Sequence, residues 1–102
     1  MNDNFTEAKS GGRNRGLYKA LNNQTDLQLL KSISSYRENI KEHHKKIRNP
    51  DEYVQNWENR SDQYKIGIIK KWRKDIFRNQ EQLEVAESVA KERGINYERW
   101  ND

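Results

Sequence analysis

The sequence predicts an all-α fold, an antiparallel αα-hairpin of two long helices with a short helix at the bend and a Gly/Arg-rich N-terminal arm. Three observations lead to this prediction. Apolar residues recur at helical spacing over two long stretches, about 25–49 and 61–94. The only proline, Pro50, separates the two stretches. No segment shows the apolar/polar alternation of a half-buried strand.

Residues 1–24 are expected to form a flexible basic arm ahead of the helical hairpin domain, 25–102. Three glycines are interleaved here with Arg13 and Arg15, and glycine clusters of this kind are typical of loops. One helical turn is expected within 17–21, before an Asn-Asn pair that favours a break.

Thr25 is expected to cap the first long helix, because Gln28 lies three residues on and can return a hydrogen bond to the Thr25 amide. An apolar stripe follows at spacings of three and four residues, which is the pattern of one buried helix face. The stripe consists of Leu29, Ile33, Tyr36, Ile40, His43 and Ile47.

Asn49 and Pro50 are expected to open the short helix at the bend, since proline suits the first helical position. Ser61, a typical N-cap residue, is expected to begin the second long helix. The apolar stripe of that helix consists of Ile66, Ile69, Trp72, Ile76, Leu83, Ala86 and Ala90. Gly94 is expected to end it in a left-handed C-cap, with Ile95 supplying the accompanying apolar contact.

The composition predicts a thin-cored helical protein whose full stability can depend on a partner. The chain of 102 residues is long enough for one domain, but only 31% of it is hydrophobic and 35% is charged. No apolar run approaches the roughly 18 residues of a membrane-spanning helix, so no membrane partner is expected. The lack of cysteine excludes disulfides, thiolate metal sites and thiol nucleophiles.

Positive charge is concentrated where the two long helices are expected to meet. Residues 25–50 carry six Lys/Arg against three acids and residues 61–78 carry six against two, whereas residues 79–102 carry three against six. Antiparallel packing brings two basic clusters together near the bend. They consist of Lys45, Lys46 and Arg48 from the first helix and Lys70, Lys71, Arg73 and Lys74 from the second. Because a basic end attracts phosphates even at a net charge of +4, these seven residues are the predicted nucleic-acid-binding set.

His43 and His44 are the only histidines of the chain. An imidazole here can act as general acid or base in RNA cleavage; the alternative is that His43 packs against the second helix and His44 is solvated. Asp75 or Glu58 can orient a histidine, or only neutralise neighbouring lysines. No metal site is expected, because adjacent histidines project about 100° apart on a helix and no carboxylate-rich motif accompanies them.

The Gly-Gly-Arg-Asn-Arg-Gly segment, residues 11–16, has the composition of a phosphate-binding loop. Its glycines permit close approach, and Arg13 and Arg15 supply bidentate donors. It lacks the lysine and hydroxyl of a P-loop and follows no strand, so no nucleotide cofactor is expected. The alternative interpretation is a plain tail or linker.

Trp72 lies among four cations in a Lys-Lys-Trp-Arg-Lys run. It can stack on a nucleic-acid base or belong to the core. Its place on the apolar stripe favours the core, and the cations remain available in either case.

The chain resembles, over residues 5–94, a helical domain found at the C-termini of bacterial polymorphic toxins. These toxins are of the rearrangement-hotspot-repeat and contact-dependent-inhibition kinds, and the resemblance is carried by short motifs that follow one another in the same order. The motifs are Gly11-Gly12-Arg13, Gly16-Leu17-Tyr18, Lys31-Ser32-Ile33, Glu42-His43, Lys46-Ile47-Arg48-Asn49-Pro50, Tyr53, Trp57, Trp72-Arg73-Lys74-Asp75-Ile76 and Gln80-Glu81-Gln82-Leu83. The resemblance implies a domain delivered as part of a larger secreted toxin, acting in the cytoplasm of the target cell and neutralised by a cognate immunity protein. Outside that context a cytoplasmic location is expected.

Nuclease activity is common among such toxins, so the resemblance implies a catalytic set of Arg13, Arg15 and His43. The chain departs from the family pattern at Asn14, where a histidine often follows the Gly-Gly-Arg/Lys motif. If that histidine is catalytic in the family, this chain lacks half of its acid–base pair.

Two hypotheses follow. In the first, the chain is a toxin domain that acts on RNA, with tRNA among the candidates, as a nuclease independent of metal and cofactor. His43 transfers the proton, Arg13 and Arg15 stabilise the phosphorane charge, and the lysines hold the backbone. In the second, it is a non-enzymatic all-helical protein-interaction module. Its interface consists of Tyr36, Phe77, Val85 and Val89 on the flanks of the stripes.

Overall fold

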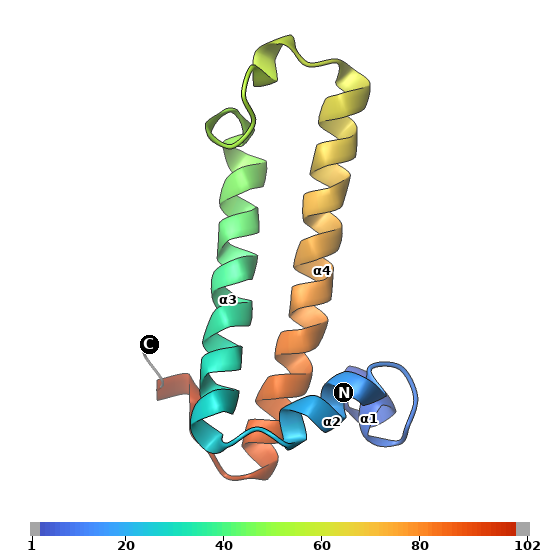
Figure 1. Ribbon diagram of the computed structural model, residues 1–102, viewed down its shortest axis with the longest axis vertical. Coiled ribbons are helices and arrows are strands. Elements are labelled where there is room, and N and C mark those ends of the chain that lie inside the picture. Colours follow the sequence, from blue (N-terminus) through green and yellow to red (C-terminus); the bar gives the residue numbers. More distant parts are fainter. Residues whose placement is uncertain (1–2, 100–102) are drawn as a thin grey trace.

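The computed structural model describes residues 3–99 and confirms the all-α hairpin (Figure 1). Two long helices, α3 (Asp26–Arg48) and α4 (Asp62–Glu92), lie antiparallel and side by side. The molecule measures 50 × 31 × 22 Å and has a radius of gyration of 16.4 Å, against about 13 Å for a compact chain of this length. The fold is therefore a rod, which leaves little depth for a core.

The ends of the long helices confirm the caps predicted from the sequence. Thr25 and Gln28 form the predicted capping box at the start of α3. The Ser61 side chain accepts a hydrogen bond from the Tyr64 amide at the start of α4. Gly94 adopts the left-handed conformation, with φ of +74°, and the Gly94 and Ile95 amides bond to carbonyls of the last turn. This Schellman pattern stops α4 and turns Ile95 onto the core.

The bend differs from the single short helix that the sequence predicts. It contains two separate 3₁₀ turns, η1 (Pro50–Glu52) and η2 (Trp57–Asn59). Pro50 occupies the expected first position of η1. Asn56 then adopts a left-handed conformation with φ of +58°, which asparagine tolerates better than most residues. A right-handed helix cannot continue through it.

The N-terminal segment differs from the predicted flexible arm. Residues 3–22 form two helices, α1 (Asp3–Lys9) and α2 (Arg15–Asn22), which pack beside the C-terminal half of α4 (Figure 1). Gly11, with φ of +93°, ends α1, and the Gly12 amide bonds to the Glu7 carbonyl. The glycines therefore cap a helix, and the apolar side chains of both helices reach the core.

The core is concentrated at the end of the rod away from the bend, where α2, α3 and α4 meet. Its buried members are Leu21, Leu29, Ile33, Val85, Ala86, Val89 and Ala90. Val85 and Val89 are thus not the exposed interface residues of the second hypothesis, because the N-terminal helices cover that side of α4. Ile66, predicted on the buried stripe, is 59% exposed, and it lies beside the exposed Lys70 and Arg73.

No helix in the described part of the chain is both long and apolar enough to span a membrane. A last 3₁₀ turn, η3 (Tyr97–Arg99), lies against α4 at the core end.

Candidate nucleic-acid interface

His43 of α3 lies opposite Asp75 of α4 near the bend. Its Nδ1 lies 2.7 Å from the Asn39 carbonyl oxygen and its Nε2 lies 3.4 Å from Oδ2 of Asp75. Since a carbonyl oxygen only accepts, Nδ1 carries a hydrogen and donates. The ring is therefore hydrogen-bonded within α3, and its Nε2 faces the Asp75 carboxylate of α4, with which it forms an ion pair when the imidazole is protonated. Asp75, rather than Glu58, is thus the acid beside the histidine.

Three basic side chains at the core end of the rod are paired with acids. Arg37 lies 2.7 Å from Glu87, and Arg93 lies 3.1 Å from Asp26 and also donates to the Asn22 carbonyl. Lys9 pairs with Glu92 and so ties α1 to α4. The hydrogen bond from Lys9 to Glu92, with the attraction of the two charges, raises the pKa of the Lys9 ammonium.

Basic side chains on the bend-side half of α4 are in the opposite situation. Lys70, Arg73, Lys74 and Arg78 are all exposed, and none makes an ion pair or hydrogen bond with another described residue. Steps of three and four residues place them on one side of α4. This side is turned away from α3, because the intervening Trp72 and Ile76 are buried. We call these four residues the outer basic face.

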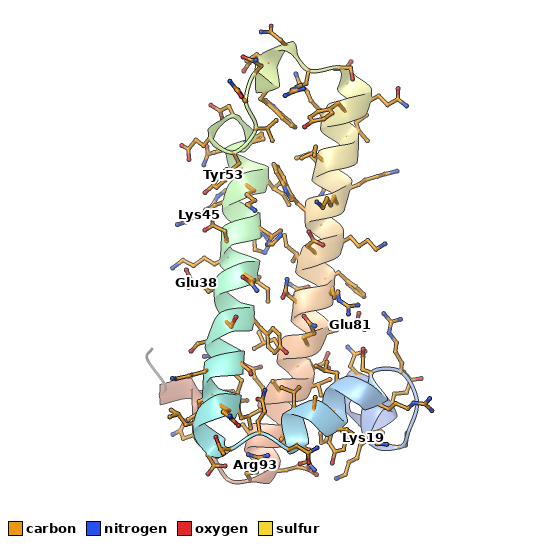
Figure 2. All side chains as sticks on the ribbon, in the orientation of Figure 1. Lys19, Glu38, Lys45, Tyr53, Glu81 and Arg93 are labelled. Atoms are coloured by element: carbon orange, nitrogen blue, oxygen red, sulfur yellow. The ribbon has the colours of Figure 1, made fainter. Side chains whose placement is uncertain are left out.

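Acidic residues that continue the same side of α4 toward the core end are occupied. Glu81, only 8% exposed, lies 2.9 Å from Nη2 of Arg13, and the Asn14 amide lies 3.5 Å away. Glu84 accepts a 2.6 Å hydrogen bond from Asn4. The N-terminal helices and their connecting loop therefore cover the acids that would otherwise oppose the outer basic face (Figure 2).

The predicted basic cluster is at one level of the rod but does not form one patch. The His43–Asp75 pair sets Lys45 about level with Arg73 and Arg48 with Lys70. Lys45, however, points away from α4 (Figure 2), and Nζ of Lys46 lies 5.8 Å from the centre of the Tyr53 ring. Lys71 is exposed too, and at about 100° per residue it lies about 20° beyond Arg78, at the edge of the outer basic face. The outer basic face is thus the densest group of unpaired cations.

The structure does not bring the predicted catalytic residues together. Arg13 is held at Glu81 and His43 at Asp75. These two acids are six residues apart on α4, which corresponds to about 9 Å along the axis and about 120° around it. Arg15, the first residue of α2, is exposed. In the loop at 11–14, the Arg13 and Asn14 side chains contact the chain's own Glu81 carboxylate.

The other residues considered as candidates lie either in buried positions or on the surface. Trp72 is buried, which confirms its assignment to the core. His44 and Glu58 are exposed. Tyr36 is half-buried beside the core, and burial raises the pKa of its phenol. Among residues 3–99 no group of three or more His, Asp or Glu side chains is placed to hold a metal ion.

Comparison with family models, with curated proteins and with solved structures finds no match to this chain. The resemblance to polymorphic toxin domains therefore stays a prediction. Sequence reasoning missed two residues that define the interface, Arg78 and Glu81. The signal for Arg78 was its spacing of four from Lys74. Glu81 gave no comparable signal, because its pairing depends on how the N-terminal helices fold back.

Proposed function

We propose that this chain binds RNA on the outer basic face of α4. One observation carries the proposal: four exposed cations within nine residues of one helix lie on one side of it and lack an acidic partner among the described residues. Unpaired surface cations on one helix face are available for phosphates, and releasing the counterions of a polyanion favours binding. Arg15, exposed at the start of α2, can extend the contact.

We further propose, from the family resemblance, that RNA binding belongs to a toxin domain delivered within a larger secreted protein. Its site of action is then the target-cell cytoplasm, and its second partner is a cognate immunity protein. An inhibitor that covers the outer basic face would need acidic groups to match it. RNA, tRNA included, is the favoured polyanion because the resemblance is to toxins that often act as nucleases.

Neutralising the outer basic face is expected to weaken RNA binding strongly. In the triple variant Lys70→Gln/Arg73→Gln/Lys74→Gln, affinity for RNA should fall on the order of 10- to 100-fold at moderate salt. The slope of log K against log salt should become less steep by about 2, at about 0.7 for each lost contact to single-stranded RNA. Fluorescence anisotropy of labelled RNA at several salt concentrations measures both quantities.

A matched control removes the same charge from the core end, by Lys19→Gln/Lys31→Gln/Lys91→Gln. These lysines are exposed and make no ion pair with a described residue, so the control should retain most of the affinity. Equal losses in both triple variants would mean that only net charge matters and would refute a defined site. No RNA binding by the unaltered protein would favour the protein-interaction module.

Cleavage is the part of the hypothesis that rests on His43. If the domain is a metal-independent ribonuclease of this type, His43→Ala abolishes fragmentation of total RNA in the presence of EDTA. The helical circular dichroism signal should remain. Because Nδ1 of His43 is hydrogen-bonded to the Asn39 carbonyl, Nε2, which faces Asp75, is the nitrogen left to transfer a proton. Asp75→Asn, which frees Nε2 from a charged partner, is the companion variant.

Fragmentation that persists in His43→Ala would remove this residue from the mechanism. An RNA pool that stays intact with the unaltered protein, at concentrations that saturate binding, would restrict the domain to binding. Total DNA serves as the second substrate, because a preference for RNA is part of the proposal.

A further inference from the structure

Phe77 is an apolar side chain that the fold leaves in water. With 60% of its surface exposed, it is the most exposed large hydrophobic residue in the described part of the chain. It lies in the middle of α4. Leaving a phenylalanine in water forgoes roughly 2 kcal/mol of burial, so its exposure invites a functional explanation.

The ring is surrounded by the outer basic face. Arg73 and Lys74 lie one turn before Phe77 on the same side of the helix, and Arg78 follows it directly. A shallow hollow of about 310 Å³ continues this side toward the bend. Its lining consists of Lys65, Ile66, Ile69, Lys70 and Arg73. Apolar and cationic groups therefore alternate along one side of α4.

This alternation matches a single nucleic-acid strand better than a duplex. A duplex presents phosphates outward and keeps its bases stacked inside, so an exposed aromatic ring gains nothing from it. A single strand offers phosphates to the cations and free base faces to the ring, and aromatic stacking between cations is the usual way in which proteins hold single strands.

An acidic protein is the other occupant that the charges would admit. The centre of a stable protein interface is a contiguous apolar patch within about 800 Å² buried on each partner. Here the apolar groups are one ring and one small hollow, separated by Arg73 and about two to three helical turns, or about 12–16 Å along the axis. Two separate apolar features at this spacing fit two bases of an extended strand, with intervening phosphates, more closely than a protein surface.

We infer that α4 binds single-stranded RNA, with one base stacked on Phe77 and another base of the same strand, further toward the bend, against Ile66 and Ile69. The inference rests on the proposed RNA binding and names the form of RNA. Lys70, Arg73 and Lys74 then contact the phosphates that link these bases.

The test compares a 12-nucleotide single strand with a 12-base-pair RNA duplex, by anisotropy, using the full chain. Phe77→Leu keeps an apolar side chain but removes the ring, and should weaken single-strand binding about 5- to 100-fold. Duplex binding should change less than twofold, and the salt slope for the single strand should not change, because no charge is altered. Phe77→Trp should keep or increase single-strand affinity.

Leu27→Ala, at an exposed apolar residue in the first turn of α3, is the control and should leave both affinities unchanged. RNA binding that is unaffected by Phe77→Leu, or equal affinity for the two RNAs, would overturn the inference and leave the proposed function standing. No binding of either RNA would refute both. Polyglutamate that competes as well as RNA, with the same sensitivity to Phe77→Leu, would also overturn it in favour of an acidic protein.

Discussion

Replacing Ile33 with alanine is expected to lower the free energy of unfolding by about 3–4 kcal/mol. Ile33 is 0% exposed and belongs to the cluster that joins α3 to α2 and α4. The truncation removes apolar contacts and leaves a cavity that rigid helices fill only in part. Because a domain of this size has only about 5–15 kcal/mol of stability in total, the Tm should fall by about 15 °C. Thermal unfolding followed by circular dichroism measures it.

The matched control is Ile66→Ala. It deletes the same atoms from the same residue type, but Ile66 is 59% exposed, so the change in unfolding free energy should stay within about 0.5 kcal/mol. Similar losses in both variants would contradict a core confined to the end of the rod away from the bend.

The long helices could be predicted because their ends carry local signals. Thr25 with Gln28, Ser61 and Gly94 each act on backbone groups within a few residues, so no knowledge of the tertiary fold was needed. The N-terminal helices could not be predicted in the same way. Two helices of seven and eight residues are too short to be stable alone. They depend on burying Ala8 and Leu21 against partners far away in sequence.

The glycine pair illustrates how one signal supports two interpretations. Gly11 and Gly12 were interpreted as a flexible or phosphate-binding loop, and in the structure they form the C-cap of α1. A helix C-cap is recognisable only when the helix before it is recognised, and the seven residues of α1 show too little periodicity for that. The error in the arm therefore follows from the missed helix.

The candidate site could be predicted in part, because some of its residues are close together in the sequence. Its cations are close in sequence, so Lys70, Arg73 and Lys74 could be grouped from their spacing. Whether they face the cations of α3 depends on the rotation of each helix about its axis. The buried residues on α4, Trp72 and Ile76, fix that rotation and turn the outer basic face away from α3.

The two halves of the rod are built differently, and this difference connects stability with function. The core end holds the apolar cluster and most of the ion pairs, whereas the bend-side half of α4 holds the outer basic face, which reaches the exposed Phe77 in the middle of the helix. Like charges crowded on one helix repel each other and destabilise it slightly. A bound polyanion removes this repulsion, so RNA should stabilise the bend end more than the core end.

Trp72→Ala is expected to have the second large effect, and a more local one. Trp72 is 7% exposed and, with Ile76, supplies the buried apolar surface of α4 near the bend. Truncation should lower the unfolding free energy by about 3–4 kcal/mol. Because few other buried contacts join the helices there, the loss should appear first as local opening. Amide hydrogen exchange of residues 64–76 should accelerate by about 100-fold or more, whereas residues 83–90 should change less.

Trp72→Phe separates the loss of packing from the loss of the indole. It should lower the unfolding free energy by less than about 2 kcal/mol, because a phenyl ring still fills part of the buried space. Phe77→Ala supplies the exposed aromatic control, with exchange near the unaltered rate. If Trp72→Ala accelerated exchange equally along α4, the rod would unfold as one cooperative unit and its ends could not differ in stability. Faster exchange confined to the bend end would show that the RNA-binding half is the half that opens, so that bound RNA slows exchange there most.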